Sequence, residues 1–323
     1  MKARARLLAI AAVLALAQGV SAQQKPANLP IIGWLSPVTA QTSPAQHLRA
    51  ALAKQGLVEG VNFRFDIRFA DGDPARLPEL ANAMVRSGVN VILASGEQAA
   101  RAAQAATKAV PIVTGGDDLV GAGIVASLSK PGGNTTGVSI FATELDAKKL
   151  EVLTELLPGA KRFGVLNDPG TSGPLRPQAM ANAARALGLE LQTIDVTRPD
   201  DLEPAFRSFQ AGGAQAVNIV ASAMLMGLRP RLGELSIRYK IPAICQWREM
   251  VQAGCLASYG VTLSELYALY GEQIGKLLKG AKPSELPVVQ PTKFELTINL
   301  KTAKALGLTI PPAVLSRADE VIE

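Results

Sequence analysis

The chain of 323 residues contains a single histidine, His47, and two cysteines, Cys245 and Cys255. A Ser-His-Asp triad would have to use His47, and a metal site built from several histidines is impossible. Two cysteines likewise cannot supply a four-cysteine zinc or iron–sulfur site. The sequence therefore excludes the commonest metal centres, and we expect neither a metal nor another cofactor.

Standard catalytic motifs are missing as well. The sequence has no GxxxxGK[ST] phosphate loop, no HExxH metal motif, no GxSxG nucleophile turn and no GxGxxG after a strand. The carboxylates of Glu97, Asp117 and Asp118 could act as a paired acid and base. Because no nucleophile accompanies them, a solvated or ligand-binding role is favoured, and we expect that the protein is not an enzyme.

Residues 1–22 have the composition of a cleavable signal peptide. Basic residues precede the apolar run Leu7–Ala17, which is short for a membrane anchor, and the small residues of Val20–Ala22 fit cleavage after Ala22. Loss of this segment would remove half of the formal net charge of +6. A cleavable signal peptide leads us to expect a periplasmic protein. The remaining basic residues are scattered and aromatic residues make up only 4% of the chain, so we expect no nucleic-acid partner.

Short apolar runs alternate with amphipathic stretches along the rest of the chain. In the first half we expect strands at Ile31–Ser36, Phe63–Phe69, Val89–Ala94 and Ile112–Thr114, and helices at Ala45–Gln55, Ala75–Ser87 and Gln98–Ala109. In the second half we expect strands at Phe163–Leu166, Glu190–Asp195, Ala216–Val220, Ala243–Cys245 and Ala257–Gly260, and helices at Pro177–Leu187, Pro199–Gln210 and Leu228–Tyr239. This alternation is typical of an α/β fold whose parallel sheet is covered by helices on both faces.

The two halves repeat one another. Ile32–Leu35 resembles Phe163–Leu166, and Val110–Ile112 matches Ile241–Ala243 at the same spacing. We therefore expect two Rossmann-like lobes with parallel sheets, joined by a hinge of several crossovers. The expected lobe I is 29–140 plus about 262–285, lobe II is 141–261 plus about 286–308, and 309–323 is an extended surface tail. Within these ranges a helix at Ser264–Lys279, a strand at Phe294–Leu300 and a helix at Thr302–Leu306 are expected.

Open parallel sheets bind ligands at the carboxyl ends of their strands. Polar or aromatic residues follow the expected strands at matching places in both lobes, although each could also be a plain cap or turn residue. Trp247 and Tyr259 could form a stacking wall for a ligand or could pack in the core. The candidate ligand-binding residues are Ser36, Ser95, Gly96, Glu97, Asp117, Asn167, Ser222, Gln246, Trp247 and Tyr259.

The cysteines leave two alternatives open. An oxidising compartment would allow a disulfide between Cys245 and Cys255. However, one cysteine ends a strand and the other precedes the next, and parallel strands place those ends at opposite edges of the sheet. Two buried free thiols are therefore favoured. His47 begins a helix and is expected to be a surface or cap residue.

Several long blocks of the sequence resemble the ABC-transporter substrate-binding proteins that include binders of tryptophan and other aromatic amino acids. These blocks are Gly121–Leu128, Lys130–Ser139, Trp247–Glu249, Ser258–Gly260, Gln290–Leu296, Lys301–Leu308 and Arg317–Ile322. The resemblance covers essentially the whole mature chain. It implies the fold of type I periplasmic binding proteins, with two Rossmann-like lobes and a ligand in the cleft between them. One departure is Asp118, which stands where the family often has proline.

Together these observations favour binding over catalysis. We expect hinge motion near Ser139–Thr143 and Gly260–Leu263 to close the lobes around a small solute, with an amino acid or similar zwitterion favoured. The resemblance implies an ABC permease in the inner membrane as a transient partner, and we expect a monomer. Two alternatives stay open at this point: a secreted sensor domain that presents its ligand to a receptor, and a secreted hydrolase that depends on His47.

Overall fold

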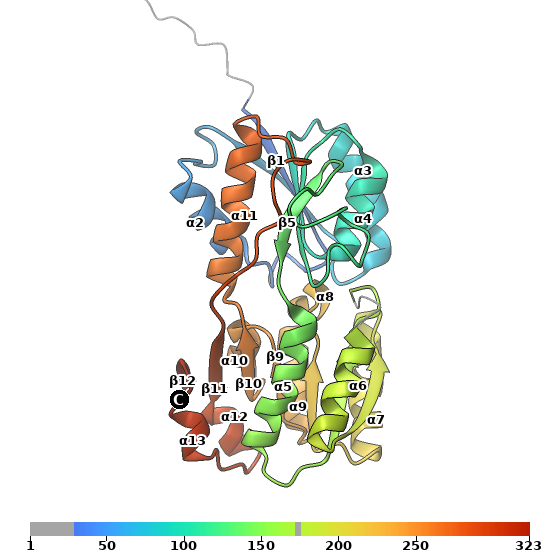
Figure 1. The fold of residues 1–323 in the computed structure, drawn as a ribbon, viewed down its shortest axis with the longest axis vertical. Coiled ribbons are helices and arrows are strands. Elements are labelled where there is room, and N and C mark those ends of the chain that lie inside the picture. Colours follow the sequence, from blue (N-terminus) through green and yellow to red (C-terminus); the bar gives the residue numbers. More distant parts are fainter. Residues whose placement is uncertain (1–28, 172–175) are drawn as a thin grey trace, which may run out of the picture.

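The computed structural model describes residues 29–171 and 176–323. The expected signal peptide and its cleavage site after Ala22 lie outside these residues. Figure 1 shows two α/β lobes, one above the other, which we call lobe I and lobe II. The two-lobe fold expected from the internal repeat is confirmed.

Lobe I contains a sheet of five parallel strands in the order β2-β1-β3-β4-β5. Apolar residues fill β1 and β3 because both of their faces are covered by helices. The strands are β1 (Ile31–Ser36), β2 (Arg64–Phe69), β3 (Val91–Ala94), β4 (Ile112–Gly116) and β5 (Thr135–Ser139). The helical segments are α2 (Ala45–Lys54), η1 (Pro74–Arg76), α3 (Leu77–Arg86), α4 (Glu97–Ala106) and α11 (Leu263–Leu278).

Lobe II contains a sheet of seven strands in the order β12-β11-β10-β9-β8-β6-β7. Its strands are β6 (Arg162–Asn167), β7 (Glu190–Asp195), β8 (Ala216–Ile219), β9 (Ala243–Cys245), β10 (Ala257–Gly260), β11 (Glu295–Asn299) and β12 (Glu320–Ile322). The helical segments are α5 (Ala142–Leu156), α6 (Arg176–Leu187), η2 (Pro199–Asp201), α7 (Leu202–Ala211), α8 (Ala223–Gly227), α9 (Arg229–Arg238), α10 (Arg248–Gln252), α12 (Leu300–Ala305) and α13 (Pro312–Leu315). The order β7-β6-β8-β9-β10 repeats that of lobe I, whereas β11 lies antiparallel to β10 and departs from the expected parallel sheet.

The chain crosses between the lobes at residues 140–141, at 261–262 and along 290–294. After the second crossing, α11 returns to lobe I and packs against α2 (Figure 1). The helices approach closely because Gly271 faces Ala51, and an added Cβ on Gly271 would lie 2.9 Å from that of Ala51. The segment up to Val289 then stays with lobe I, which extends this lobe beyond the expected boundary near 285. The N–H of Val289 donates to the carbonyl of Gly137, and the N–H of Ser139 donates to the carbonyl of Val289.

The C-terminal segment differs from the expected extended tail. Residues Pro312–Leu315 form the short helix α13, and Glu320–Ile322 pair in parallel with β11 as the edge strand β12. The segment is therefore part of the sheet of lobe II. Helix α5 was also absent from the expected elements, although it covers β8, β9 and β10.

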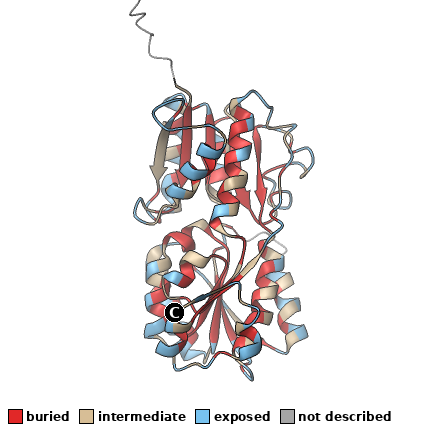
Figure 2. Cartoon of the chain, turned by 90° about the vertical axis from the view of Figure 1, so that its left-hand side faces the viewer, coloured by how far each residue is buried: buried red, intermediate tan, exposed pale blue. Residues whose placement is uncertain are grey.

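Figure 2 shows that the buried residues concentrate in the two sheets and on the inward faces of the helices. Both cysteines are buried free thiols, as favoured from the sequence, and Sγ of Cys245 donates to the carbonyl of Ala257 at 3.3 Å. Within residues 29–171 and 176–323, no helix combines the length and apolar character needed to cross a membrane.

Candidate ligand-binding site

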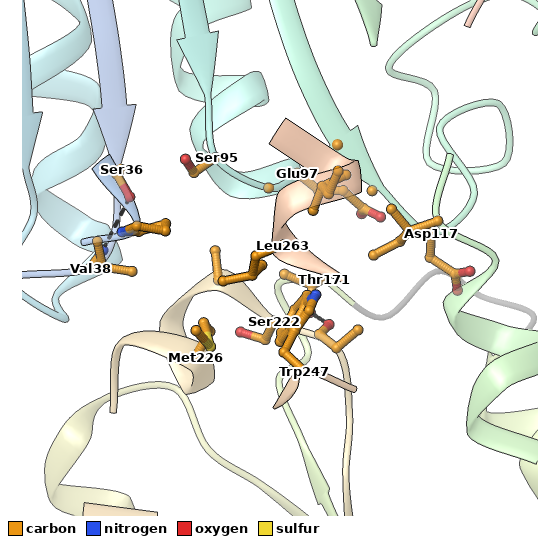
Figure 3. A pocket seen from close by; sticks show the side chains of 18 of the residues that line it. Ser36, Val38, Ser95, Glu97, Asp117, Thr171, Ser222, Met226, Trp247 and Leu263 are labelled. Atoms are coloured by element: carbon orange, nitrogen blue, oxygen red, sulfur yellow. Dashed lines mark hydrogen bonds between the residues drawn. The ribbon is translucent and has the colours of Figure 1, made fainter. Parts of the chain in front are cut away.

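A cavity lies between the lobes, at the carboxyl ends of the strands of both sheets (Figure 3). This is the position where open α/β sheets bind ligands. The cavity brings together the expected residues Ser36, Ser95, Gly96, Glu97, Asp117, Ser222 and Trp247.

Lobe I contributes the ends of β1, β3 and β4. Ser36 ends β1, and Ser95 follows β3, where its hydroxyl accepts a hydrogen bond of 2.7 Å from Nε1 of Trp34. Gly96 adopts a φ of +86°, which allows the sharp turn from β3 into α4 and places Glu97 in the first turn of that helix. Asp117 follows β4, and its carboxylate accepts a hydrogen bond of 2.8 Å from the N–H of Thr143.

Lobe II contributes the ends of β8 and β9. The hydroxyl of Ser222 donates to Oδ2 of Asp168 at 2.6 Å and accepts from the N–H of Leu225, which caps helix α8. Trp247 follows β9 and is buried against the cavity. Among the residues that the structure describes, none pairs with its indole Nε1. Figure 3 shows this nitrogen at the end of the ring nearest lobe I.

Two buried tyrosines of α11, Tyr267 and Tyr270, also line the cavity and were not expected from the sequence. Their rings meet edge to face with centroids 5.4 Å apart. Burial raises the pKa of both phenols well above the ordinary range, so both stay neutral. Gly115 makes room for this pair, since an added Cβ there would lie 1.8 Å from the hydroxyl oxygen of Tyr270. The sequence shows the aromatic residues of α11, but it does not show that this helix returns to the cavity.

Glu97 is 3% exposed, and burial raises the pKa of its carboxyl to about 7. The charge of Arg176 and the backbone N–H of Asp117 oppose this rise but do not cancel it. In the described part of the chain, no group donates a hydrogen bond to its Oε1. Glu97 is therefore a buried acid that can change protonation near neutral pH.

Asp117 takes part in a buried network of charges that spans both lobes. Its Oδ2 lies 3.3 Å from Nη2 of Arg176 in α6, and Nε of Arg176 lies 3.3 Å from Oδ2 of Asp146 in α5. Nζ of Lys149 pairs in turn with Oδ1 of Asp146 at 2.6 Å and donates to the carbonyl of Ile219. Arg176 lines the cavity, although the expected helix began at Pro177 and left this residue out.

Three expected residues do not line this cavity. Nδ2 of Asn167 donates to Oδ1 of Asp195 at 2.7 Å, and the residue faces a separate groove beside α6. Gln246 is buried, and its side chain packs beside Gly260. The ring of Tyr259 stacks near that of Phe294, with centroids 6.5 Å apart. Asp118, the departure from the family pattern, caps its own turn by accepting from the N–H of Gly121 and does not line the cavity either.

Direct contacts hold the lobes together around the cavity. Nε2 of Gln98 donates to Oδ1 of Asp168 at 3.2 Å, and Nη1 of Arg229 donates to the carbonyl of Thr42 at 2.8 Å. Nε2 of His47 in lobe I lies 3.7 Å from Oε1 of Glu249 in lobe II. His47 therefore makes a contact between the lobes and is not a plain surface residue. The structure is therefore a closed form. Across the described residues, no group of three or more His, Cys, Asp or Glu side chains is arranged to hold a metal ion.

The chain was compared with known proteins. Residues 39–322 match the model of the family described as ABC transporter substrate binding protein. A curated relative, a tyrosine-binding protein of Clostridioides difficile, is 29% identical over 260 residues, which cover 80% of this chain and 74% of the relative.

Solved structures show the same fold at 26% identity. The ABC domain from Streptococcus pneumoniae in complex with L-Trp matches with a TM-score of 0.82 over 91% of this chain and 100% of that one. A ligand-free, open substrate-binding protein with adhesive properties from Clostridium difficile matches with a TM-score of 0.61 over 91% and 99%. The lower TM-score against the open, ligand-free structure agrees with the closed arrangement of the lobes.

Proposed function

Because the chain belongs to the family of ABC transporter substrate-binding proteins, we propose that it captures an amino acid between its lobes and delivers it to a membrane permease. The observation that carries the proposal is the closed cavity, which combines buried polar groups from the strand ends of both lobes with the rings of Trp247, Tyr267 and Tyr270. Polar groups at fixed positions suit the charged ends of an amino acid, and aromatic rings suit its side chain.

The aromatic lining favours an aromatic amino acid. Tyr267 and Tyr270 lie on the lobe I side and Trp247 lies on the lobe II side, so a flat side chain would contact rings from both lobes. The names of a tyrosine-binding relative and of a tryptophan complex support the same choice. Tryptophan and tyrosine are therefore the first ligands to test.

Capture follows from the two-lobe design. A ligand that contacts both lobes stabilises the closed form relative to the open one, and the crossings at 140–141, 261–262 and 290–294 form the hinge. A permease that recognises the closed form then receives only loaded protein. We propose that the protein acts as a monomer in the periplasm after cleavage behind Ala22.

The proposal is tested by thermal-shift measurements on residues 23–323, refolded to remove any ligand carried over from expression. The panel contains amino acids, small peptides, organic acids, nucleosides and sugars. A ligand at 100 times its dissociation constant stabilises the folded state by about 2.7 kcal/mol, which shifts the melting temperature by several degrees. A shift with tryptophan or tyrosine supports amino-acid capture, and a panel without any shift contradicts solute binding.

A further inference from the structure

Glu97 is a buried acid that lines the cavity, and one oxygen of its carboxyl group lacks a hydrogen-bond partner among the described residues. Figure 3 places its side chain on the lobe I wall, opposite Trp247 of lobe II. No donor within residues 29–171 and 176–323 reaches its Oε1, although the side chain is only 3% exposed. A buried carboxylate oxygen without a hydrogen bond is costly, so a ligand that supplies a donor gains from the pairing.

Resting on the proposed function, we propose that Glu97 is the specificity-determining acceptor for a cationic ammonium group of the ligand. When the ammonium binds, the proton held on the Glu97 carboxyl leaves to solvent, and the carboxylate and ammonium pair inside the closed cavity. The protein would therefore select amino acids over the corresponding carboxylic acids that lack the amine, and it would release protons as it loads.

The balance of charge around the cavity supports a cationic ligand group. Asp117 and Asp146 are matched by Arg176 and Lys149, and all four side chains are buried. The ionised form of Glu97 adds a negative charge to this balanced set. Asp168, which is also buried, accepts from Ser222, Gln98 and the backbone N–H of Gly170, so its oxygens are engaged within the protein. A ligand ammonium would neutralise the surplus at Glu97 without breaking the existing pairs.

The surroundings of Glu97 also support the loss of a proton on binding. The charged groups that act on it are Arg101 on its own helix, Asp117 after β4, and Arg176 on α6, while Tyr267 and Tyr270 of α11 stay neutral. Burial dominates and raises the pKa to about 7, so about half of the molecules carry the proton at neutral pH. An ammonium at this site favours the ionised form and lowers that pKa.

The selectivity is tested by calorimetric titration of matched ligand pairs into wild type and Glu97→Gln. The pairs are L-tryptophan with indole-3-propionate, and L-tyrosine with 3-(4-hydroxyphenyl)propionate, which differ by the amine. We expect wild type to prefer the amine-bearing member of a pair, and Glu97→Gln to weaken its binding by about 10- to 100-fold at about pH 8. Glu79→Gln is the matched control, because Glu79 is exposed and also lies in the first turn of a lobe I helix.

The release of protons is tested by repeating the titration in buffers of different ionisation enthalpy. At about pH 7 we expect wild type and Glu79→Gln to release about half a proton per ligand, and Glu97→Gln to release none. Because this readout needs only wild type, it remains informative even if the substitution impairs folding.

The outcomes separate this inference from the proposed function. Equal affinity of wild type and Glu97→Gln for the amino acid, or binding without proton release, overturns the role of Glu97 and leaves amino-acid capture intact. A solute without any cationic group as the best ligand overturns the role of Glu97 and leaves solute capture intact. Wild type that binds nothing in the whole panel overturns both.

Discussion

Asp117 of lobe I and Arg176 of lobe II form an ion pair across the ligand cavity, with Oδ2 of the carboxylate 3.3 Å from Nη2 of the guanidinium. The N–H of Thr143 at the start of α5 also donates to the Asp117 carboxylate. The pair therefore ties the end of β4 to two helices of lobe II. Both contacts are present in this closed arrangement of the lobes.

Arg176→Met removes the guanidinium and leaves two buried carboxylates, Asp117 and Asp146, without this partner. We expect the free energy of unfolding to fall by about 3–5 kcal/mol, as is usual when one member of a buried pair is deleted. Urea denaturation measures the change. Arg317→Met is the control, because its partnership with Glu155 is at the surface, and we expect a change below about 1 kcal/mol. Equal losses in both variants would contradict a special role for the cavity pair.

Trp247→Phe keeps an aromatic ring in the cavity but removes the indole N–H. Because this donor has no partner among the described residues, we expect little loss of stability and a fall in ligand affinity of up to about tenfold. Trp34→Phe is the comparison variant, because Trp34 is buried in lobe I and contacts Ser95 and Tyr267, which line the cavity. With a ligand other than tryptophan, the fluorescence change on binding should be larger in Trp34→Phe than in Trp247→Phe. The reverse pattern would place the ligand away from Trp247.

The stability of the ligand-free protein should depend on the protonation of Glu97. Its pKa rises from 4.5 to about 7 on folding, so the folded state binds more protons than the unfolded state within that window. The free energy of unfolding should therefore fall by up to about 3 kcal/mol as pH rises through the window, and stay level above it. Denaturation without ligand at about pH 5 and about pH 8 measures this fall.

Glu97→Gln should remove most of that dependence and be more stable than wild type at about pH 8, because it has no charge to bury. Asp168, whose pKa is also raised by burial, preserves a smaller trend of the same sign. Glu79→Gln should follow wild type. A Glu97→Gln variant with the full wild-type dependence would show that another group is responsible.

Gly115→Ala should damage binding through Tyr270. An added Cβ lies 1.8 Å from the hydroxyl oxygen of that buried side chain, so the ring must leave its position in the cavity wall. We expect a loss of about 1–3 kcal/mol in stability and weaker ligand binding, both measured on the same preparation. In the control Gly212→Ala, the Cβ meets the flexible end of Gln192, which can move aside. Unchanged binding in Gly115→Ala would exclude Tyr270 from the site.

The sequence predicted those parts of the site that follow directly from buried strands. Ser36, Ser95 and Asp117 come immediately after apolar runs, so their place at the strand ends could be inferred. Arg176 and Tyr267 could not be found in this way, because they come from helices whose return to the cavity depends on the packing of the lobes. The direction of β11 could not be predicted from the sequence either. This strand enters its sheet from the last crossing and lies antiparallel to β10.

Helix α5 was missed for a related reason. Asp146 and Lys149 interrupt its apolar pattern, and charged residues normally mark a solvent-exposed face. In the folded protein both are fully buried, because they pair with each other and Asp146 also pairs with Arg176. A buried ion network of this kind cannot be recognised until its partners are brought together in space.

A crystal structure of residues 23–323, grown with the amino acid that gives the largest thermal shift, tests the central claim most directly. We expect the ligand between the lobes, with its ammonium at Glu97 and its side chain against Trp247 and Tyr267, in the closed arrangement described above. A ligand bound outside this cavity, or held by one lobe while the lobes stand apart, would contradict capture by closure.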